Sequence, residues 1–353
     1  WEMYFARPTA LKGTLGLTLK AARPTLFFGV PRVWEKIQEK IIKGAKANPP
    51  SMPMKMLIDY LKSVNLKTYY AKQLDGDGNI PFGYTLAEKL LVNKVRGRLG
   101  FDRIQCTFTG AAPTSTATLE FWGSLGVDII EVYGMSESCG VHTVSLPYYN
   151  KQGTVGVPIT GVTTLLQNNP ERDSKGHGEI CMRGRHIMMG YMYDDDKTKR
   201  AIDDEGYLHS GDVGMIDDKY NILKITGRIK ELIITAGGEN IAPVPIEDYI
   251  KQLCPAISNV VVIGDRKKYL SCLITIRLQQ NKDTMEFSNE LDGLSKDVDE
   301  ECKTVEDAKK SEKWKNYIQN AINKYNSDPD YCVSNAQKIQ YYRILNGDFG
   351  VES

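Results

Sequence analysis

The sequence lacks three features that would place it in a specialised class. It has no apolar run near the roughly 20 residues that a membrane-spanning helix needs, and its runs at 26–30 and 260–263 are far shorter. It has no excess of one charge: 45 basic and 44 acidic residues leave a net charge of +1, which favours neither nucleic acid as a partner nor an acidic tail. It has no secretory segment and opens on Trp1, so we expect an internal piece of a longer polypeptide.

Cysteine is present but without a pattern. The seven cysteines are scattered, with neither paired metal-ligand spacing nor a dense disulfide framework, so reduced thiols and a cytoplasmic setting are expected. Any membrane contact would be peripheral. His177, His186 and His209 are isolated along the sequence from one another and from the cysteines, so we assign them no ligand role and expect no zinc site.

Hydrophobic periodicity and turn residues predict a chain of mixed helices and strands, long enough for two domains. Helices are predicted at 11–22, 33–43, 54–73, 86–99, 114–125, 197–202, from 246 and around 314–325, and strands at 25–30, 103–109, 127–132, 221–226, 232–234, 259–264 and 271–278. A small β-rich region is expected from residue 153. Residues 279–310 are polar and are interpreted as an insertion.

The stretch 207–247 concentrates charged residues around short strands. Ser210-Gly211-Asp212 is interpreted as a tight turn that presents one carboxylate, able to accept hydrogen bonds from the two hydroxyls of a ribose. Arg228 follows the next strand and could close over the same sugar or a phosphate. Lys230, between two strands, is a candidate pivot.

Tyr133, Ser136 and Glu137 lie where the strand 127–132 is predicted to end, and ligands of open α/β sheets collect at such strand ends. Tyr133 could stack on a purine, Ser136 could donate to a phosphate oxygen, and Glu137 could hold magnesium. The alternative is a surface turn with a solvated glutamate. A hydrolase nucleophile elbow is disfavoured because Ser138 replaces its closing glycine, although His142 or His209 could be imagined as the base.

The small residues Gly110, Ala111, Ala112 and Pro113 follow another predicted strand. They would let a flat ring approach the backbone closely. The alternative is an ordinary connection from strand to helix, with Thr114 or Ser115 as the helix cap.

Together these stretches resemble the adenylate-forming enzymes, the superfamily of acyl-CoA synthetases and luciferases. Within it they are most similar to the bubblegum-type long-chain fatty-acid CoA ligases. The motifs that carry the resemblance are VPRVWEKI (30–37), FTGAAP (108–113), EVYGMSES (131–138), GEICMRGRHIMMGY (178–191) and GRIKELIITAGGEN (227–240). They are collinear and cover nearly the whole chain.

The resemblance implies an α/β fold, with residues 1–227 as the latter part of a large AMP-binding domain and 232–353 as a small, mobile α+β domain. It implies a hinge at 228–231 and an AMP-forming reaction that activates a fatty acid through acyl-AMP to acyl-CoA. The expected cofactors are ATP, magnesium and coenzyme A. The implied roles are nucleotide binding for Gly110, Ala111, Ala112, Pro113, Tyr133, Gly134, Met135, Asp212 and Arg228, catalysis for Ser136, Glu137 and Lys230, magnesium binding for Glu137, and passage of the pantetheine arm at Gly238.

Two expected parts of the family are missing. The phosphate-binding loop would precede Trp1, and nothing after Asn346 matches the motif of the terminal adenylating lysine, so this chain alone is expected to be a poor enzyme. Two alternatives remain open: a catalytically inactive acyl- or nucleotide-binding relative that serves as a scaffold, and an adenylating enzyme for aryl or amino acids.

Overall fold

The structure is a computed structural model, and it describes residues 2–7, 10–173, 175–281 and 286–349. The chain divides into two compact units. The first comprises Trp1–Gln167, Glu179–Ser210 and Gly214–Ile225, and the second comprises Asn168–Gly178, Gly211–Val213 and Thr226–Ser353.

The first unit is built on a five-stranded sheet of order β1-β2-β3-β4-β5. The strands are β1 (Leu26–Phe28), β2 (Cys106–Thr109), β3 (Ile129–Met135), β4 (Gly140–Val144) and β5 (Val157–Pro158). Strands β1, β2 and β3 are parallel, and β4 and β5 are antiparallel to their neighbours. The carboxyl ends of β2 and β3 therefore lie side by side, which brings the predicted loops at 110–113 and 133–137 to the same sheet edge.

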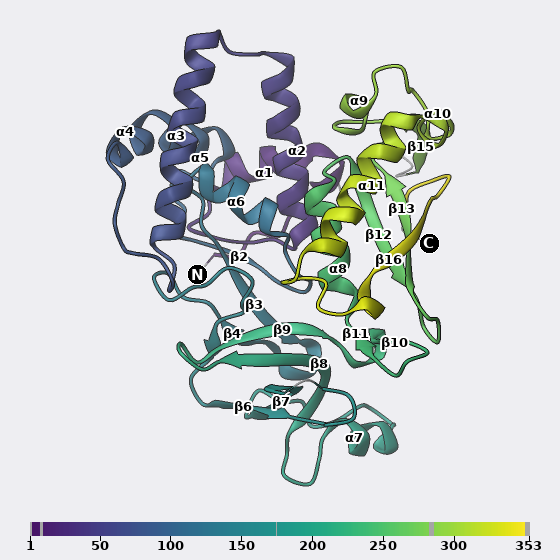
Figure 1. Cartoon of the computed structure of the whole chain (residues 1–353). Coiled ribbons are helices and arrows are strands. Elements are labelled where there is room, and N and C mark those ends of the chain that lie inside the picture. Colours follow the sequence, from purple (N-terminus) through teal and green to yellow (C-terminus); the bar gives the residue numbers. More distant parts are fainter. Residues whose placement is uncertain (1, 8–9, 174, 282–285, 350–353) are drawn as a thin grey trace. The chain divides into compact units, whose positions relative to one another are not determined.

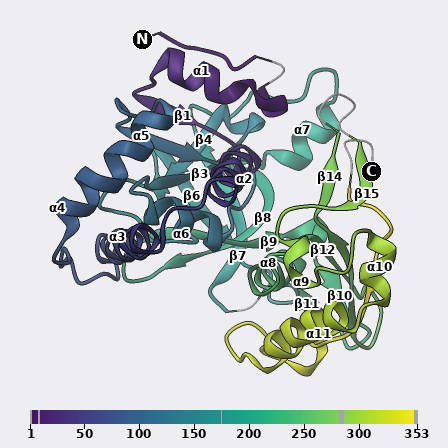
Figure 2. The same cartoon turned by 90° about the horizontal axis from the view of Figure 1, so that it is seen from above.

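Helices surround this sheet, as Figure 2 shows for α1, α2, α3 and α5. They are η1 (Ala10–Thr14), α1 (Leu15–Ala22), α2 (Pro31–Ala47), α3 (Met52–Ala71), α4 (Tyr84–Ala87), η2 (Glu88–Val92), α5 (Asn93–Leu99) and α6 (Thr116–Ser124). Trp34 of α2 and Trp122 of α6 are fully buried, and their rings meet edge to face at 5.1 Å. Aromatic burial of this kind fixes α2 and α6 on the sheet.

A second sheet, of order β6-β7-β8-β9, follows along the chain. Its strands are β6 (Val162–Gln167), β7 (His177–Gly184), β8 (Leu208–Asp217) and β9 (Ile222–Arg228), with α7 (Asp195–Ala201) between β7 and β8. Ile180, Met182, Leu208 and Leu223 pack into one buried cluster with Tyr133. This sheet is the β-rich region expected from residue 153.

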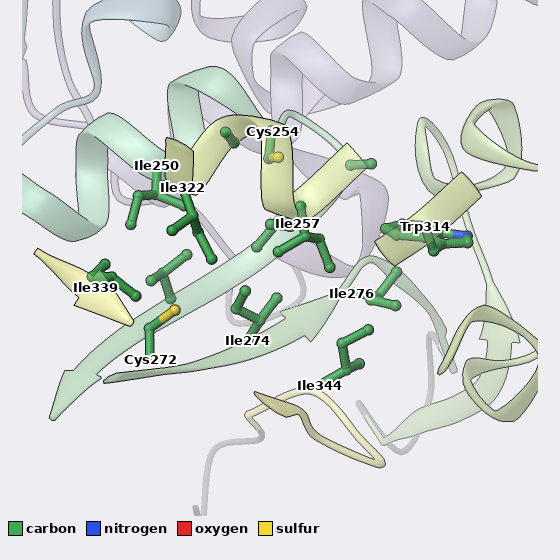
Figure 3. Packing of buried hydrophobic residues seen from close by; sticks show 14 of the residues in the cluster. Ile250, Cys254, Ile257, Cys272, Ile274, Ile276, Trp314, Ile322, Ile339 and Ile344 are labelled. Atoms are coloured by element: carbon green, nitrogen blue, oxygen red, sulfur yellow. The ribbon is translucent and has the colours of Figure 1, made fainter. Parts of the chain in front are cut away.

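The second unit has a hydrophobic core on the sheet β12-β13-β16, to which α8 and α11 contribute buried side chains. Figure 1 shows both helices beside this sheet. Its elements are η4 (Ile229–Glu231), β10 (Ile233–Ile234), β11 (Asn240–Ile241), α8 (Pro243–Leu253), β12 (Ile257–Ile263), β13 (Leu270–Ile276), β14 (Leu278–Gln280), β15 (Phe287–Leu291), α9 (Ser295–Val298), α10 (Val305–Lys310), α11 (Glu312–Ser327), η5 (Asn335–Gln337) and β16 (Ile339–Ile344). Figure 3 shows Ile250, Ile322 and Ile274 within this core.

Several sequence predictions need correction. The strand at 25–30 was expected to be buried, but β1 is an edge strand in which Leu26 and Phe28 are exposed. The region 279–310 is not only a loose polar insertion, because Leu291, Val305 and Ala308 belong to the core of the second unit. Its residues 282–285 lie outside the described residues.

Among the described residues, no helix combines the length and the apolar character needed to cross a bilayer. All seven cysteines are described and none forms a disulfide.

Candidate nucleotide-binding site

The segment 133–138 comprises the end of β3 and the turn that leads to β4, and it differs from the prediction in one respect. The strand was expected to end at Val132, but β3 continues through Met135 because β4 returns alongside it. Gly134 is required by this pairing, since a Cβ there would lie 1.7 Å from the carbonyl oxygen of Gly140. The turn itself is the short 3₁₀ segment η3 (Ser136–Ser138).

Ser138 closes this turn. Its hydroxyl accepts a hydrogen bond from the backbone N–H of Met135 at 3.1 Å and lies within donating distance of the carbonyl oxygens of Met135 and Gly140. Ser138 is 1% exposed, whereas Ser136 is exposed. Ser138, which distinguishes this motif from a hydrolase elbow, therefore stabilises the turn, a role that was not evident from the sequence.

Glu137 is held in place by the segment that precedes α7. Its Oε1 accepts a hydrogen bond from the Tyr191 hydroxyl at 2.8 Å, and its backbone carbonyl accepts from the N–H of Met188 at 2.9 Å. The bond to Glu137 raises the pKa of Tyr191, because the carboxylate favours the protonated phenol. Tyr191 was quoted as part of a motif but was given no role, since no local spacing links it to Glu137.

Tyr133 occupies a different environment from the one expected. The residue is 8% exposed and belongs to one buried cluster with Ile180, Met182 and Leu208. Only a small part of the ring is available to a purine, so its predicted stacking role stays a prediction.

The small-residue loop after β2 lies against β3. A Cβ on Gly110 would meet the carbonyl oxygen of Val132 at 2.9 Å, so this glycine permits close packing of the loop on the neighbouring strand. Ala111 has a φ of 71°, which is unusual for a residue other than glycine and is typical of functional loops. Ser115 caps α6 by accepting from the N–H of Thr118, as the alternative interpretation expected.

Glu131 connects this loop to the rest of the unit. Burial raises its pKa to about 7, and the backbone N–H groups of Thr114 and Gly153 donate to its carboxylate and oppose that rise. Glu131 was given no role from the sequence, where it is only the first residue of the motif 131–138. Its position as a charged residue within a predicted strand was the one sign that its side chain has a special environment.

Asp212 and Arg228 lie in the second unit and form an ion pair, with 2.9 Å between Nε and Oδ1. Ser210-Gly211-Asp212 was predicted to be a tight turn, but these residues are part of β8. Gly211 has a φ of 74° there. That conformation favours glycine and interrupts the regular strand. The Asp212 side chain is 10% exposed and the Arg228 side chain 60%, so the guanidinium offers the more accessible surface to a ligand.

Lys230 is exposed and lies in η4, directly after β9. The pair Gly237-Gly238 connects β10 and β11, with a hydrogen bond from the N–H of Gly238 to the carbonyl oxygen of Thr235. Gly238 has a φ of 81°. Beyond its chain neighbours, none of the described residues comes within 4 Å of the place that a Cβ on Gly238 would occupy, which is compatible with the approach of another molecule.

Comparisons with known proteins identify the family. Residues 2–192 match the AMP-binding enzyme family, and residues 230–338 match the AMP-binding enzyme C-terminal domain. The first match covers more than half of the chain, so this chain belongs to the AMP-binding enzyme family.

Among curated proteins, the chain is 45% identical to long-chain-fatty-acid–CoA ligase ACSBG2 of Gallus gallus, over 99% of this chain and 45% of that protein. It is 40% identical to ACSBG1 of Homo sapiens, over 99% of this chain and 48% of that protein. The resemblance to the bubblegum-type ligases is thereby confirmed. The chain spans about half the length of the curated relatives it matches.

Solved structures confirm the α/β fold class. The anthranilate CoA ligase AuaEII in complex with anthranoyl-AMP matches with a TM-score of 0.60 at 14% identity, over 98% of this chain and 52% of that chain. The A domain of carboxylic acid reductase from Segniliparus rugosus matches with a TM-score of 0.59 at 19% identity, over 99% of this chain and 45% of that chain. At these identities the likeness concerns the fold alone.

Proposed function

We propose that the whole protein is an AMP-forming long-chain fatty-acid–CoA ligase. The observation that carries this proposal is the similarity of 99% of the chain to proteins named long-chain-fatty-acid–CoA ligase, at 38–46% identity for ACSBG2 and 40% for ACSBG1. In the proposed reaction the fatty-acid carboxylate attacks the α-phosphate of ATP and pyrophosphate leaves. The thiol of coenzyme A then attacks the acyl carbon and AMP leaves.

Glu137 is the proposed magnesium ligand. It is half-buried, its Oε1 is oriented by Tyr191, and a carboxylate is a ligand that Mg²⁺ prefers. When bound, the ion neutralises phosphate charge. Exposed Ser136, one residue earlier, would donate to a phosphate oxygen.

Asp212 and Arg228 are proposed to hold the ribose. Asp212 would accept from the sugar hydroxyls, and Arg228, already oriented by its ion pair with Asp212, would present its exposed guanidinium. The loop of Gly110, Ala111, Ala112 and Pro113, together with Tyr133, Gly134 and Met135, would form the wall for the adenine.

The domain division is also a proposal: residues 1–227 in the large domain, a hinge at 228–231 and a mobile domain at 232–353. Exposed Lys230 in η4 would be the pivot between the two half-reactions. Gly238 would admit the pantetheine arm in the second half-reaction. An apolar acyl tail would gain about 0.8 kcal/mol per buried methylene group. A cytoplasmic location with peripheral membrane contact belongs to the same proposal.

Pyrophosphate release by the full-length protein tests this function. We expect release that depends on a long-chain fatty acid and exceeds release with aryl or amino acids. Preference for an aryl or amino acid would favour the other adenylating enzymes, and no release with any acid would favour the inactive scaffold.

Variants of Glu137 test the assignment of the site. Glu137→Gln keeps the shape of the side chain but removes its charge, and should lower the rate of pyrophosphate release roughly 100-fold or more. Tyr191→Phe should have a smaller effect, because it removes only the orienting hydrogen bond. Glu88→Gln, on the exposed surface of η2, is the matched control and should leave the rate unchanged.

A further inference from the structure

We propose that Glu179, Cys181 and His209 form a zinc site on the β6-β7-β8-β9 sheet. In the described part of the chain these three residues are the one group of histidine, cysteine and acidic side chains whose potential ligand atoms all lie within 4.8 Å of one another. No zinc site was expected from the sequence, because the spacing of these residues along the chain does not group them. The proposal does not depend on the proposed function.

Strand geometry explains why distant residues meet here. Glu179 and Cys181 are two apart on β7, so their side chains point to the same face of the sheet, while Ile180 and Met182 point into the opposite, apolar cluster. His209 is on β8, the neighbour of β7 in the sheet. Two adjacent strands thus present three ligand types at one point.

The separations agree with tetrahedral zinc. Cys181 Sγ lies 3.6 Å from His209 Nδ1, and His209 Nδ1 lies 3.1 Å from Glu179 Oε2. Bonds of about 2.3 Å to sulfur and about 2.0–2.2 Å to nitrogen and oxygen place tetrahedral ligands roughly 3.4–3.6 Å apart. The two separations that involve His209 Nδ1 are therefore within a few tenths of an ångström of those in a tetrahedral site, and all three ligand atoms lie within 4.8 Å of one another.

Charge and tautomer also fit. A cysteine thiolate, a glutamate and a neutral imidazole balance the two positive charges of Zn²⁺. Asp203 Oδ2 lies 3.5 Å from His209 Nε2, and Asp203 Oδ1 is itself fixed by the N–H groups of Glu205 and Tyr207. A carboxylate at Nε2 favours the tautomer whose Nδ1 lone pair faces the ion, the usual arrangement around a metal-bound histidine.

The cysteine ligand is buried, and the side of the site formed by His209 and Asp203 is open enough for an ion to enter. Cys181 is 1% exposed, whereas the side chains of His209 and Asp203 are 23% and 37% exposed. Gln167 Oε1, 3.8 Å from Cys181 Sγ, or a water molecule is available for the fourth position. Such a site would join β7 to β8.

Metal binding by the chain 1–353 tests this proposal. We expect one Zn²⁺ per chain in competition with a chromophoric chelator, and Co²⁺ should produce a thiolate-to-metal charge-transfer band with the visible spectrum of a tetrahedral site. Cys181→Ser should remove that band, and His209→Gln should weaken binding at least tenfold. Cys139→Ser, at an exposed cysteine, should change neither measurement.

Two variants at neighbouring positions of one turn distinguish an effect on zinc binding from a folding defect. Asp203→Asn should weaken zinc binding about 10–100-fold by loosening the orientation of His209, while Asp204→Asn, at the exposed next residue, should have no effect. Absence of stoichiometric binding by the unaltered chain would overturn the proposal. Binding that survives Cys181→Ser and His209→Gln, or a doubly protonated His209 that simply bridges Glu179 and Asp203, would overturn it too.

Discussion

The two units bury their hydrophobic residues in different ways. The second unit has one continuous core, all of it drawn from residues 233–344, on the sheet β12-β13-β16. The first unit divides its buried residues among three smaller clusters, around Trp34 and Trp122, around Leu61, and around Tyr133. A unit with a closed core can move as a body, because its packing does not change when it moves.

This difference agrees with the proposed division of work. The residues 110–113 follow β2, and the residues 133–137 form the end of β3 and the turn after it, so both stretches lie at strand ends of the first unit. The second unit carries Lys230 and Gly238 outside its core.

The largest effect is expected for the buried tryptophans. Trp314→Ala in the second unit and Trp122→Ala in the first each remove a fully buried indole and should cost about 3–5 kcal/mol of unfolding free energy. Hydrogen exchange measured by mass spectrometry should show loss of protection throughout 233–344 for Trp314→Ala, and only in the first unit for Trp122→Ala. Equal loss in both units for both variants would show that the cores are not separate.

Protonation of His142 should remove stability from the first unit in acid. Burial, and the neighbouring His186, lower the pKa of His142 to about 4, against about 6.5 when unfolded. The unfolded chain therefore binds the proton more readily, and stability is lost as the pH falls from about 6.5 towards 4, by up to about 3 kcal/mol. The core at 233–344 contains no histidine.

Urea unfolding between pH 4 and 7 measures this loss. Relative to its stability at pH 7, the first unit should be more stable at pH 4 in the His142→Gln variant than in the unaltered chain, while the second unit should not change. The same pH dependence with and without the substitution would assign the effect to other groups.

The buried carboxyl of Glu131 should act with the opposite sign. Its pKa is raised to about 7, so its contribution is fully present below the unfolded pKa near 4.5 and is lost as the pH rises through 7. Glu131→Gln should therefore stabilise the first unit by about 1–3 kcal/mol at pH 8 and much less at pH 5. Glu88→Gln, at an exposed position, should show no such pH dependence in the same unfolding measurements.

The smallest effects are expected at matched helix caps. Ser115 caps α6 in the first unit, and Ser311 caps α11 in the second by accepting from the N–H of Trp314. Replacement by alanine should cost about 1 kcal/mol in each. Ser311→Ala should cost more, because the Ser311 hydroxyl donates to the carboxylate of Asp299 at 2.6 Å, whereas the Ser115 hydroxyl donates to the neutral hydroxyl of Thr118 at 2.9 Å. Thermal unfolding in which Ser115→Ala loses more stability than Ser311→Ala would contradict this order.

Local features of the fold were predictable from the sequence. Helix α11 was expected around 314–325 and spans Glu312–Ser327, and the helix at 33–43 lies within α2. These elements follow from apolar periodicity, capping residues and proline positions, which act over one or two helical turns. The site motifs could also be located from the sequence, because each is a short contiguous stretch.

Features that depend on strand pairing were not predictable. The extension of β3 through Met135, the inclusion of Asp212 in β8, and the edge position of β1 all depend on a partner strand. The bond between Tyr191 and Glu137 joins residues 54 positions apart, and Cys181 and His209 are 28 apart. No local pattern contains such contacts, since pairing register is fixed by the packed sheet.

The half-reactions of the full-length protein test the central claim most directly, namely the proposal that the domain 232–353 pivots about Lys230 between adenylation and thioester formation. Rapid-quench measurements of acyl-AMP formation and of its conversion to acyl-CoA should show that Lys230→Ala slows one step much more than the other. Lys224→Ala, at an exposed lysine of β9, should leave both rates unchanged. Equal slowing of both steps by Lys230→Ala, or no slowing of either, would contradict the account.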